Sequence, residues 1–416
     1  MRYLAVFAIS LSVALPAHAS DQPVYGPVPS WISPNSLPAA AATATDAPIT
    51  FLLFDNQARL GPGVVETYSH YAFRINNAQG LSAGNVVAAW DPAFGDLTVH
   101  RVVIRRGDQQ IDALAKGQKF TILRREQELE QQTLNGQLTA TLQPEGLQAG
   151  DILEVEISQS RRDPTLRDHL EMKGGFNVPV RTEEAMFRVI LPAKSSVQQR
   201  LSGGLSQPTV VTKGADKILT WKIAPLLPET APAFAPSRYA NGKLIEISDF
   251  NGWDDVAQLF LPLFEKASAI SADSGLRPEI ERIKAASADP LQRAGLALRL
   301  VEEKIRYVNL ALGVGGLVPA SADETWRRRF GDCKAKTALL TGLLHELGID
   351  AVPVLVSSTD GDGLDERLPM VGSFDHVVVR SNIGGKTYWL DGTRTGDIAI
   401  THLDTPLYYW GLPIAR

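Results

Sequence analysis

The sequence of 416 residues contains very little sulfur, with one cysteine and four methionines. A single cysteine, Cys333, excludes a disulfide within the chain, an iron–sulfur cluster and a zinc site built from several thiolates. The seven histidines form no close His–His or His–carboxylate pair of the kind that binds a metal on a helix. The sequence therefore predicts no metal ion and no cofactor.

Positive charge is not in excess, because the sequence has 41 lysines and arginines and 46 aspartates and glutamates. A nucleic-acid-binding protein needs a basic face, so the sequence predicts no nucleic acid partner. Beyond the N-terminal stretch no apolar run is long enough to span a membrane. The content of hydrophobic and charged residues, 44% and 21%, is typical of a globular protein. The oligomeric state stays open.

The first 19 residues have the pattern of an export signal. Arg2 supplies a positive start, residues 3–15 are apolar and uncharged, and small residues at 17 and 19 have the A-x-A spacing. We expect a signal peptide over residues 1–19 that is cleaved after Ala19, and hence a periplasmic or otherwise exported protein. A lone cysteine there is either a small buried residue or a working thiol.

The remaining sequence changes its pattern twice. Residues 20–48 are rich in proline, alanine and serine, and predict a linker or a loosely packed arm. Residues 49–247 alternate apolar and polar positions between turn-forming clusters, and predict an antiparallel β-sandwich-like domain. Residues 251–416 begin with helical three–four spacing and end in strands. The predicted fold class is therefore α+β. The clearest strand patterns are ITFLLFD, VVETYSHYAFRIN, LTVHRVVIRRG, KFTILRR, DILEVEISQS, EAMFRVILP and KILTWKI.

Cys333 stands where a helix is expected to begin. Asp332 is a good N-cap residue, and the apolar pattern after it ends at Gly348. The first turn of a helix carries a partial positive charge and free N–H groups, which favour a thiolate and can hold an oxyanion. Lys334 and Lys336 add positive charge nearby. The alternative is an inert buried cysteine.

A nucleophilic thiol needs a base, and two histidines are available. His345 lies on the same predicted helix, twelve residues on, and a rise of 1.5 Å per residue places it ~18 Å away. His376 interrupts the apolar strand pattern FDHVVVR, where an imidazole is costly unless it is hydrogen-bonded. We therefore expect His376 to be the base.

A predicted hairpin brings an aspartate to His376. The strand patterns FDHVVVR and KTYWLDGT are joined by SNIGG, a strong turn signal. A register that pairs Arg380 with Thr387 places Asp391 opposite His376 on the same face, and a slip of two residues keeps them there. Cys333, His376 and Asp391 then have the order of nucleophile, base and orienting carboxylate. Asp375 points to the other face and is expected to be structural or gating.

The segments WRRRFGDCKAKTALLTGLLHELGIDAVPVLV, SFDHVVV and KTYWLDGTR resemble the transglutaminase-like superfamily of papain-related cysteine enzymes. The similarity covers residues 291–395 and is greatest to bacterial exported members, in which an uncharacterised β domain precedes the core. It implies that residues 251–416 form a transglutaminase-like domain with Cys333, His376 and Asp391 as its catalytic triad. Members usually continue further at the C-terminus. The family's upstream tryptophan is not matched by Trp326, and Tyr307 and Asn309 are candidates for the cleft wall.

The resemblance implies acyl transfer from a protein or peptide amide in the cell envelope through a thioester. Water as acceptor gives a peptidase or amidase, and an amine gives a cross-linking transglutaminase. The alternative is a catalytically silent scaffold that carries a β-sandwich binding module. The run of arginines at residues 327–329 either steers an anionic substrate or is a solvated helix end.

Overall fold

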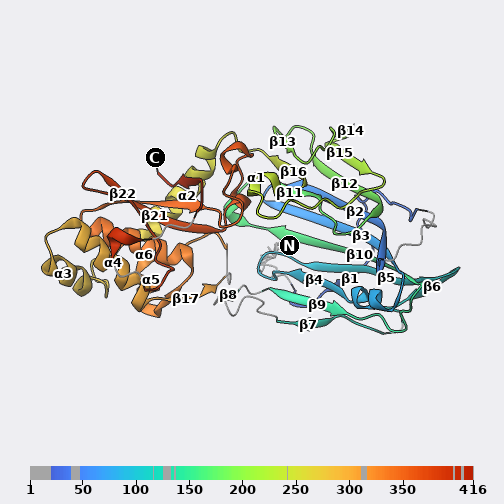
Figure 1. The fold of residues 1–416 in the computed structure, drawn as a ribbon, viewed down its shortest axis with the longest axis horizontal. Coiled ribbons are helices and arrows are strands. Elements are labelled where there is room, and N and C mark those ends of the chain that lie inside the picture. Colours follow the sequence, from blue (N-terminus) through green and yellow to red (C-terminus); the bar gives the residue numbers. More distant parts are fainter. Residues whose placement is uncertain are drawn as a thin grey trace, which may run out of the picture.

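The computed structural model describes residues 20–38, 47–115, 117–124, 133–134, 137–240, 242–310, 316–396, 399–403 and 407–415. The predicted signal peptide and its cleavage site after Ala19 lie outside these residues. The molecule is a mixed α+β structure in which a large β-sheet region precedes a smaller region that carries most of the helices (Figure 1).

A nine-stranded sheet forms the body of the first region. Its order is β1-β5-β10-β3-β2-β12-β15-β14, and β6 pairs with β5. Neighbouring strands are antiparallel except at the β1–β5 and β2–β12 pairs. The strands are β1 (Val24–Tyr25), β2 (Ile49–Gly61), β3 (Val64–Ile75), β5 (Leu97–Arg106), β6 (Gln109–Asp112), β10 (Ile152–Arg162), β12 (Thr182–Pro192), β14 (Thr209–Lys213) and β15 (Asp216–Ile223).

Two three-stranded sheets cover the apolar face of the large sheet. The sheet β4-β9-β7 buries residues such as Trp90 against Phe73 and Leu153, and the sheet β11-β16-β13 packs Ile245 near Phe187. Since strand residues alternate between faces, the period-two pattern of the long strands produces this single apolar face. The strands are β4 (Val86–Trp90), β7 (Thr121–Leu123), β9 (Leu138–Leu142), β11 (Glu171–Phe176), β13 (Gln198–Leu201) and β16 (Lys243–Ser248).

The opposite face of the large sheet is polar at its centre, and the N-terminal segment crosses it. Gln57 exchanges hydrogen bonds with the backbone of Ser33, at 3.0 and 2.7 Å. Arg188 donates to the carbonyl of Trp31, and His100 bonds the carbonyl of Gly26. The described part of the predicted arm, residues 20–38, is therefore attached to the sheet.

The second region surrounds the sheet β22-β21-β20-β23. Helix α6 is central to it and packs on β20 and β21 on one side and near α2, α4 and α5 on others. The helices are α1 (Ser237–Ala240), α2 (Trp253–Ser268), α3 (Arg277–Ala286), α4 (Pro290–Lys304), α5 (Ala322–Arg328) and α6 (Cys333–Glu346). The strands are β17 (Arg306–Tyr307), β18 (Asn309–Leu310), β19 (Phe330–Gly331), β20 (Asp350–Val356), β21 (His376–Ile383), β22 (Lys386–Leu390) and β23 (Gly411–Pro413).

Short elements complete the described structure. Strand β8 (Thr133–Leu134) of the first region pairs with β18 of the second, so the two regions are joined by a strand ladder. In the described residues no helix combines the length and the apolar character needed to cross a membrane. The 3₁₀ helices are η1 (Ala78–Gly84), η3 (Pro164–Leu166), η4 (Leu364–Glu366), η5 (Val371–Ser373) and η6 (Ile400–His402).

Candidate active site

Cys333 is the first residue of α6, as the sequence predicts. The Asp332 side chain caps the helix by accepting a hydrogen bond from the Ala335 amide at 2.8 Å. The amides of Cys333 and Lys334 precede the first intrahelical hydrogen bond, and no described residue accepts from them. Cys333 is buried, with 6% of its surface exposed. Its thiol therefore lies at the positive end of a helix and is shielded from bulk water.

His376 opens β21, and the hydroxyl of Thr337, one turn after the cysteine, holds α6 to this strand. That hydroxyl donates to the carbonyl of Val377 at 3.0 Å. The hairpin that follows differs from the predicted one. Gly384 and Gly385, both with positive φ, form a two-residue turn in place of the longer loop, residues 381–386, that the predicted register leaves.

The predicted register was therefore wrong by two residues. Arg380 pairs with Trp389 and not with Thr387, so Asp391 lies diagonal to His376 instead of directly opposite. The two side chains stay on one face because the shift is even. Nε2 of His376 donates to Oδ2 of Asp391 at 2.9 Å.

The carboxylate of Asp391 holds the imidazole from one side. With Nε2 on Asp391, Nδ1 remains for the thiol of Cys333, which interacts electrostatically with the ring. Oδ1 of Asp391 accepts from the amide and the hydroxyl of Thr393, at 2.9 and 2.6 Å. Tyr408 lies beside the ring, with 6.0 Å between the two ring centroids. Every polar atom of the orienting carboxylate therefore has a partner.

The charges of the pair stabilise each other. Burial disfavours the charged imidazolium, but the bonds and charges of Asp391 and Cys333 outweigh it and raise the pKa of His376 to about 10. Burial likewise opposes the carboxylate of Asp391, yet His376 and Thr393 hold its pKa below the usual range. The site therefore favours an imidazolium–carboxylate pair at neutral pH.

The two lysines near Cys333 have different surroundings. Lys334 forms an ion pair with Asp332. Lys336 is 1% exposed and donates from Nζ to the carbonyl of Ile305 at 2.6 Å. Burial lowers the pKa of Lys336 to about 8, against the opposing charges of Glu302 and Asp391. Lys336 therefore faces the carboxylate side of the site.

The other residues singled out in the sequence lie around this centre. His345 bonds the carbonyl of Ala351 at the far end of α6, at 2.8 Å. Trp326 belongs to the core beneath α6, and Tyr307 packs against the apolar cluster that contains Cys333. Asn309 lies in β18, and its side chain is outside the described structure. Asp375 accepts from the amide and the hydroxyl of Ser358, which makes it a loop anchor.

The β-sheet region holds the loop that leads into His376. The carboxylate of Glu171, on β11, accepts from the amides of Val371 and Gly372 in η5, at 2.6 and 3.0 Å. Buried Arg367 donates to Glu246 on β16 at 2.7 Å. The loop before the histidine is thus built on strands that lie more than 100 residues earlier.

Three residues that support the site were not predicted from the sequence. Thr393 had a local signal, because a Thr two residues after an Asp commonly closes a small side-chain turn. Tyr408 and Glu171 come from segments remote from the triad, and no local pattern marks either of them.

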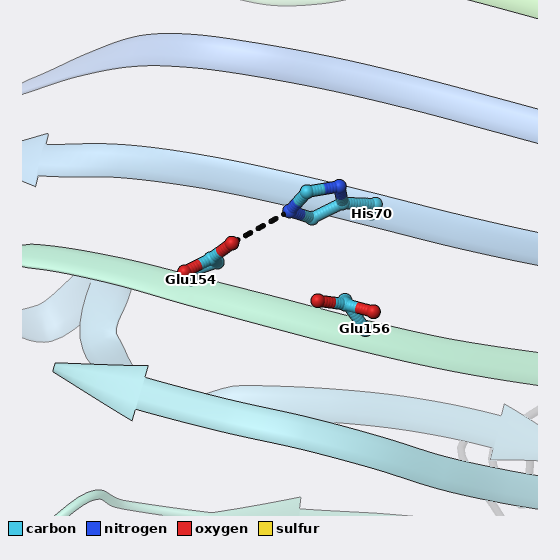
Figure 2. A group of neighbouring side chains, drawn as sticks. All are labelled: His70, Glu154 and Glu156. Atoms are coloured by element: carbon cyan, nitrogen blue, oxygen red, sulfur yellow. Dashed lines mark hydrogen bonds and ion pairs between the residues drawn. The ribbon is translucent and has the colours of Figure 1, made fainter. Parts of the chain in front are cut away.

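A second cluster of candidate ligand side chains lies on the polar face of the large sheet. Figure 2 shows His70 on β3 pointing toward Glu154 and Glu156 on β10. Each carboxylate is already engaged, Glu154 by His70 at 3.0 Å and by Arg105 at 2.7 Å, and Glu156 by Tyr68 at 3.0 Å. These bonds are those of a buried ion-pair network.

The chain is similar to known proteins mainly in its fold. A family model described as a domain of unknown function with solved structure, DUF3857, matches residues 62–230, which is less than half of the chain. No curated protein matches the chain.

Several solved structures are similar to the chain at low sequence identity. The crystal structure of a "putative protease" from Parabacteroides distasonis has a TM-score of 0.66 at 14% identity, over 83% of this chain and 67% of that one. A "putative cysteine protease" from Cytophaga hutchinsonii, at 11% identity, covers 59% and 79% with a TM-score of 0.26. An M1 zinc metallopeptidase from Deinococcus radiodurans, at 12% identity, covers 50% and 44% with a TM-score of 0.26. The P. distasonis structure shares the overall mixed α+β fold of this chain.

Proposed function

We propose that the chain is an exported cysteine enzyme of the transglutaminase-like type, which transfers the acyl group of an amide through a thioester on Cys333. The observation that carries the proposal is the imidazole of His376, which is hydrogen-bonded to Asp391 and interacts electrostatically with the thiol at the start of α6. The signal-like pattern of residues 1–19 supports export. The protease name of the P. distasonis protein agrees with this chemistry.

The first half of the reaction forms the thioester. The thiolate of Cys333, paired with the His376 imidazolium, attacks the amide carbon, and the carbonyl electrons move to oxygen. The free N–H groups at the start of α6 are placed to hold that oxyanion. The carbon–nitrogen bond then breaks, and His376 gives its proton to the leaving amine. Asp391 keeps the ring oriented and stabilises its charge in the earlier state.

The second half releases the acyl group. His376, now neutral, takes a proton from water or from an acceptor amine, which attacks the thioester carbon. Collapse of this intermediate expels the thiolate, and the protonated imidazole pairs with it again. Water gives a carboxylic acid, as in a peptidase or amidase, and an amine gives a new amide, as in a cross-linking enzyme.

Trapping the acyl-enzyme tests this proposal. The mature chain is mixed with a peptide extract of the cell envelope, quenched in acid and weighed by intact mass spectrometry. We expect an adduct on Cys333 that neutral hydroxylamine removes and that the Cys333→Ala variant does not form. Identification of the released product as acid or amide separates hydrolysis from transamidation. Absence of any Cys333 adduct would favour the silent scaffold with a binding module.

A further inference from the structure

A pocket of about 800 Å³ opens beside the candidate triad. Its walls are residues 302–308, at the end of α4 and through β17, residues 328–330, at the end of α5 and the start of β19, and Thr393 and Thr395. This volume is within the ~300–1,000 Å³ of ordinary ligand sites. A space of this size accommodates several residues of a peptide.

The pocket borders the segments that carry two of the three triad residues. Strands β17 and β19 pair in parallel, with Tyr307 opposite Gly331, and Cys333 follows two residues later. On the other side, Thr393 donates both its amide and its hydroxyl to Asp391. The pocket therefore adjoins the triad at Thr393, which bonds Asp391, and at the strand that leads to Cys333.

Positive charge dominates the walls. Lys304, Arg306, Arg328 and Arg329 stand against Glu302 and Glu303, so four positive and two negative charges leave a net charge of two positive. Glu302 is also buried and faces the ammonium of Lys336. Within the described residues none of the three arginines forms an ion pair. They are therefore available for carboxylates of a bound molecule.

Two of the three arginine side chains, those of Arg328 and Arg329, lie against aromatic rings. The guanidinium of Arg329 lies 3.4 Å from the ring centroid of Trp326, and that of Arg328 lies 4.8 Å from Phe330. Nε of Arg328 also donates to the carbonyl of Phe330 at 2.7 Å. Stacked guanidiniums keep their forked donors free at their edges, which suits bidentate binding of carboxylates.

The backbone at Arg329 supports a role for its side chain. Arg329 ends α5 in the left-handed conformation, with φ of 63°. Glycine adopts this conformation without strain, whereas an arginine there is strained. The position therefore holds a large cationic side chain where the local fold favours none.

We infer that the amide substrate is an acidic peptide, whose carboxylates bind Arg306, Arg328 and Arg329 beside Cys333. This inference rests on the proposed function. Of the two alternatives for the arginine run at residues 327–329, it assigns Arg328 and Arg329 to the substrate. Arg327 instead forms an ion pair with Glu324 along α5 and does not line the pocket.

A matched pair of electrophilic peptides tests the inference. Iodoacetyl-Glu-Glu-Gly amide and iodoacetyl-Gln-Gln-Gly amide differ only in charge, and each alkylates Cys333 as the sulfur–carbon bond forms and iodide leaves. The readout is the ratio of their second-order labelling rates. We expect the acidic peptide to react at least about tenfold faster at low salt. A tenfold difference in rate corresponds to ~1.4 kcal/mol, and charge-assisted hydrogen bonds contribute more than this to binding. Salt should bring the ratio toward one.

Variants locate the source of the preference. Arg306→Gln and the double change Arg306→Gln, Arg329→Gln should lower the ratio stepwise, whereas Arg327→Gln is the matched control and should keep the wild-type ratio. If a variant fails to fold, the ratio of labelling rates measured with the wild type is sufficient to test the inference. Equal rates for the two peptides, with Cys333 still reactive toward iodoacetamide, would overturn the acidic-substrate inference alone. A Cys333 that reacts with iodoacetamide only as an ordinary free thiol would overturn the proposed function as well.

Discussion

At the scale of single residues, the site depends on one imidazole with two partners. Nε2 of His376 is committed to Asp391, which leaves Nδ1 for the thiol of Cys333. Thr393 donates its amide and its hydroxyl to the other carboxylate oxygen, which holds the carboxylate in its orientation toward the ring. This second set of bonds fixes the ring orientation that proton transfer requires.

The His376–Asp391 pair predicts how stability depends on pH. The folded-state pKa of His376 is raised to about 10, so its contribution is full below the ordinary histidine value and is lost as pH rises toward 10. The pKa of Asp391 is lowered, so its contribution is present above ~3.9 and is lost as pH falls below that value. The free energy of unfolding lost in Asp391→Asn should therefore be largest between these limits.

Urea unfolding of the wild type and of Asp391→Asn across pH 3–10 checks this prediction. The exposed Asp254→Asn on α2 serves as a control for general charge effects. A difference between wild type and Asp391→Asn that stays constant over the whole range would contradict the buried ion pair.

At the scale of elements, the cap of α6 links folding to the candidate chemistry. Asp332→Ala removes the acceptor for the Ala335 amide and should lower the free energy of unfolding by ~0.5–2 kcal/mol. It should also slow alkylation of Cys333, because the first turn loses its fixed geometry. Asp289→Ala removes the corresponding cap of α4, which accepts from Leu291 and Gln292, and serves as the matched control.

Chemical denaturation and iodoacetamide labelling of both variants separate the two effects. We expect both changes to destabilise the fold and only Asp332→Ala to slow labelling at a pH where the protein remains folded. Equal labelling rates in the two cap variants would mean that the helix start does not activate the thiol.

Some helices and strands could be predicted from the sequence alone, and others could not. The helix start at Cys333 and the long strands of the large sheet were predicted because caps and period-two alternation act locally. The hairpin register was missed by two residues because the turn was centred on the whole of SNIGG, whereas the Gly384–Gly385 pair alone forms it, as its local preference for positive φ allows. Strand β11 was not predicted, since its Gly174 resembles a turn signal. The ring of Phe187 fills the space where a Cβ of residue 174 would lie, and this packing requires glycine there.

At the scale of the whole molecule, the two regions are joined at the loop before His376. Glu171 binds the amides of Val371 and Gly372, and the Arg367–Glu246 pair is buried beside them. The β-sheet region therefore supports the position of the base from outside the helical region. This arrangement could not be read from the sequence, because the partners are about 120 to 200 residues apart.

This junction predicts the effect of Glu171→Gln. A glutamine offers one acceptor oxygen in place of two, so one amide of η5 loses its partner at a cost of ~1–3 kcal/mol. Hydrogen exchange of the full chain should show faster exchange at Val371 and Gly372. Glu183→Gln, which removes an ion pair with exposed Arg181, is the control and should change stability by less than ~1 kcal/mol. Unchanged exchange in η5 would show that Glu171 does not hold the loop.

The most direct test of the proposed site is the pH profile of iodoacetamide labelling at Cys333. With one cysteine in the chain, all of the signal comes from this thiol. The wild type should label rapidly down to mildly acidic pH, His345→Gln should behave like the wild type, and His376→Ala should shift its labelling midpoint up toward the ~8.5 of a free thiol. A wild-type midpoint at or above ~8.5, or an identical profile in His376→Ala, would contradict a thiol activated by His376.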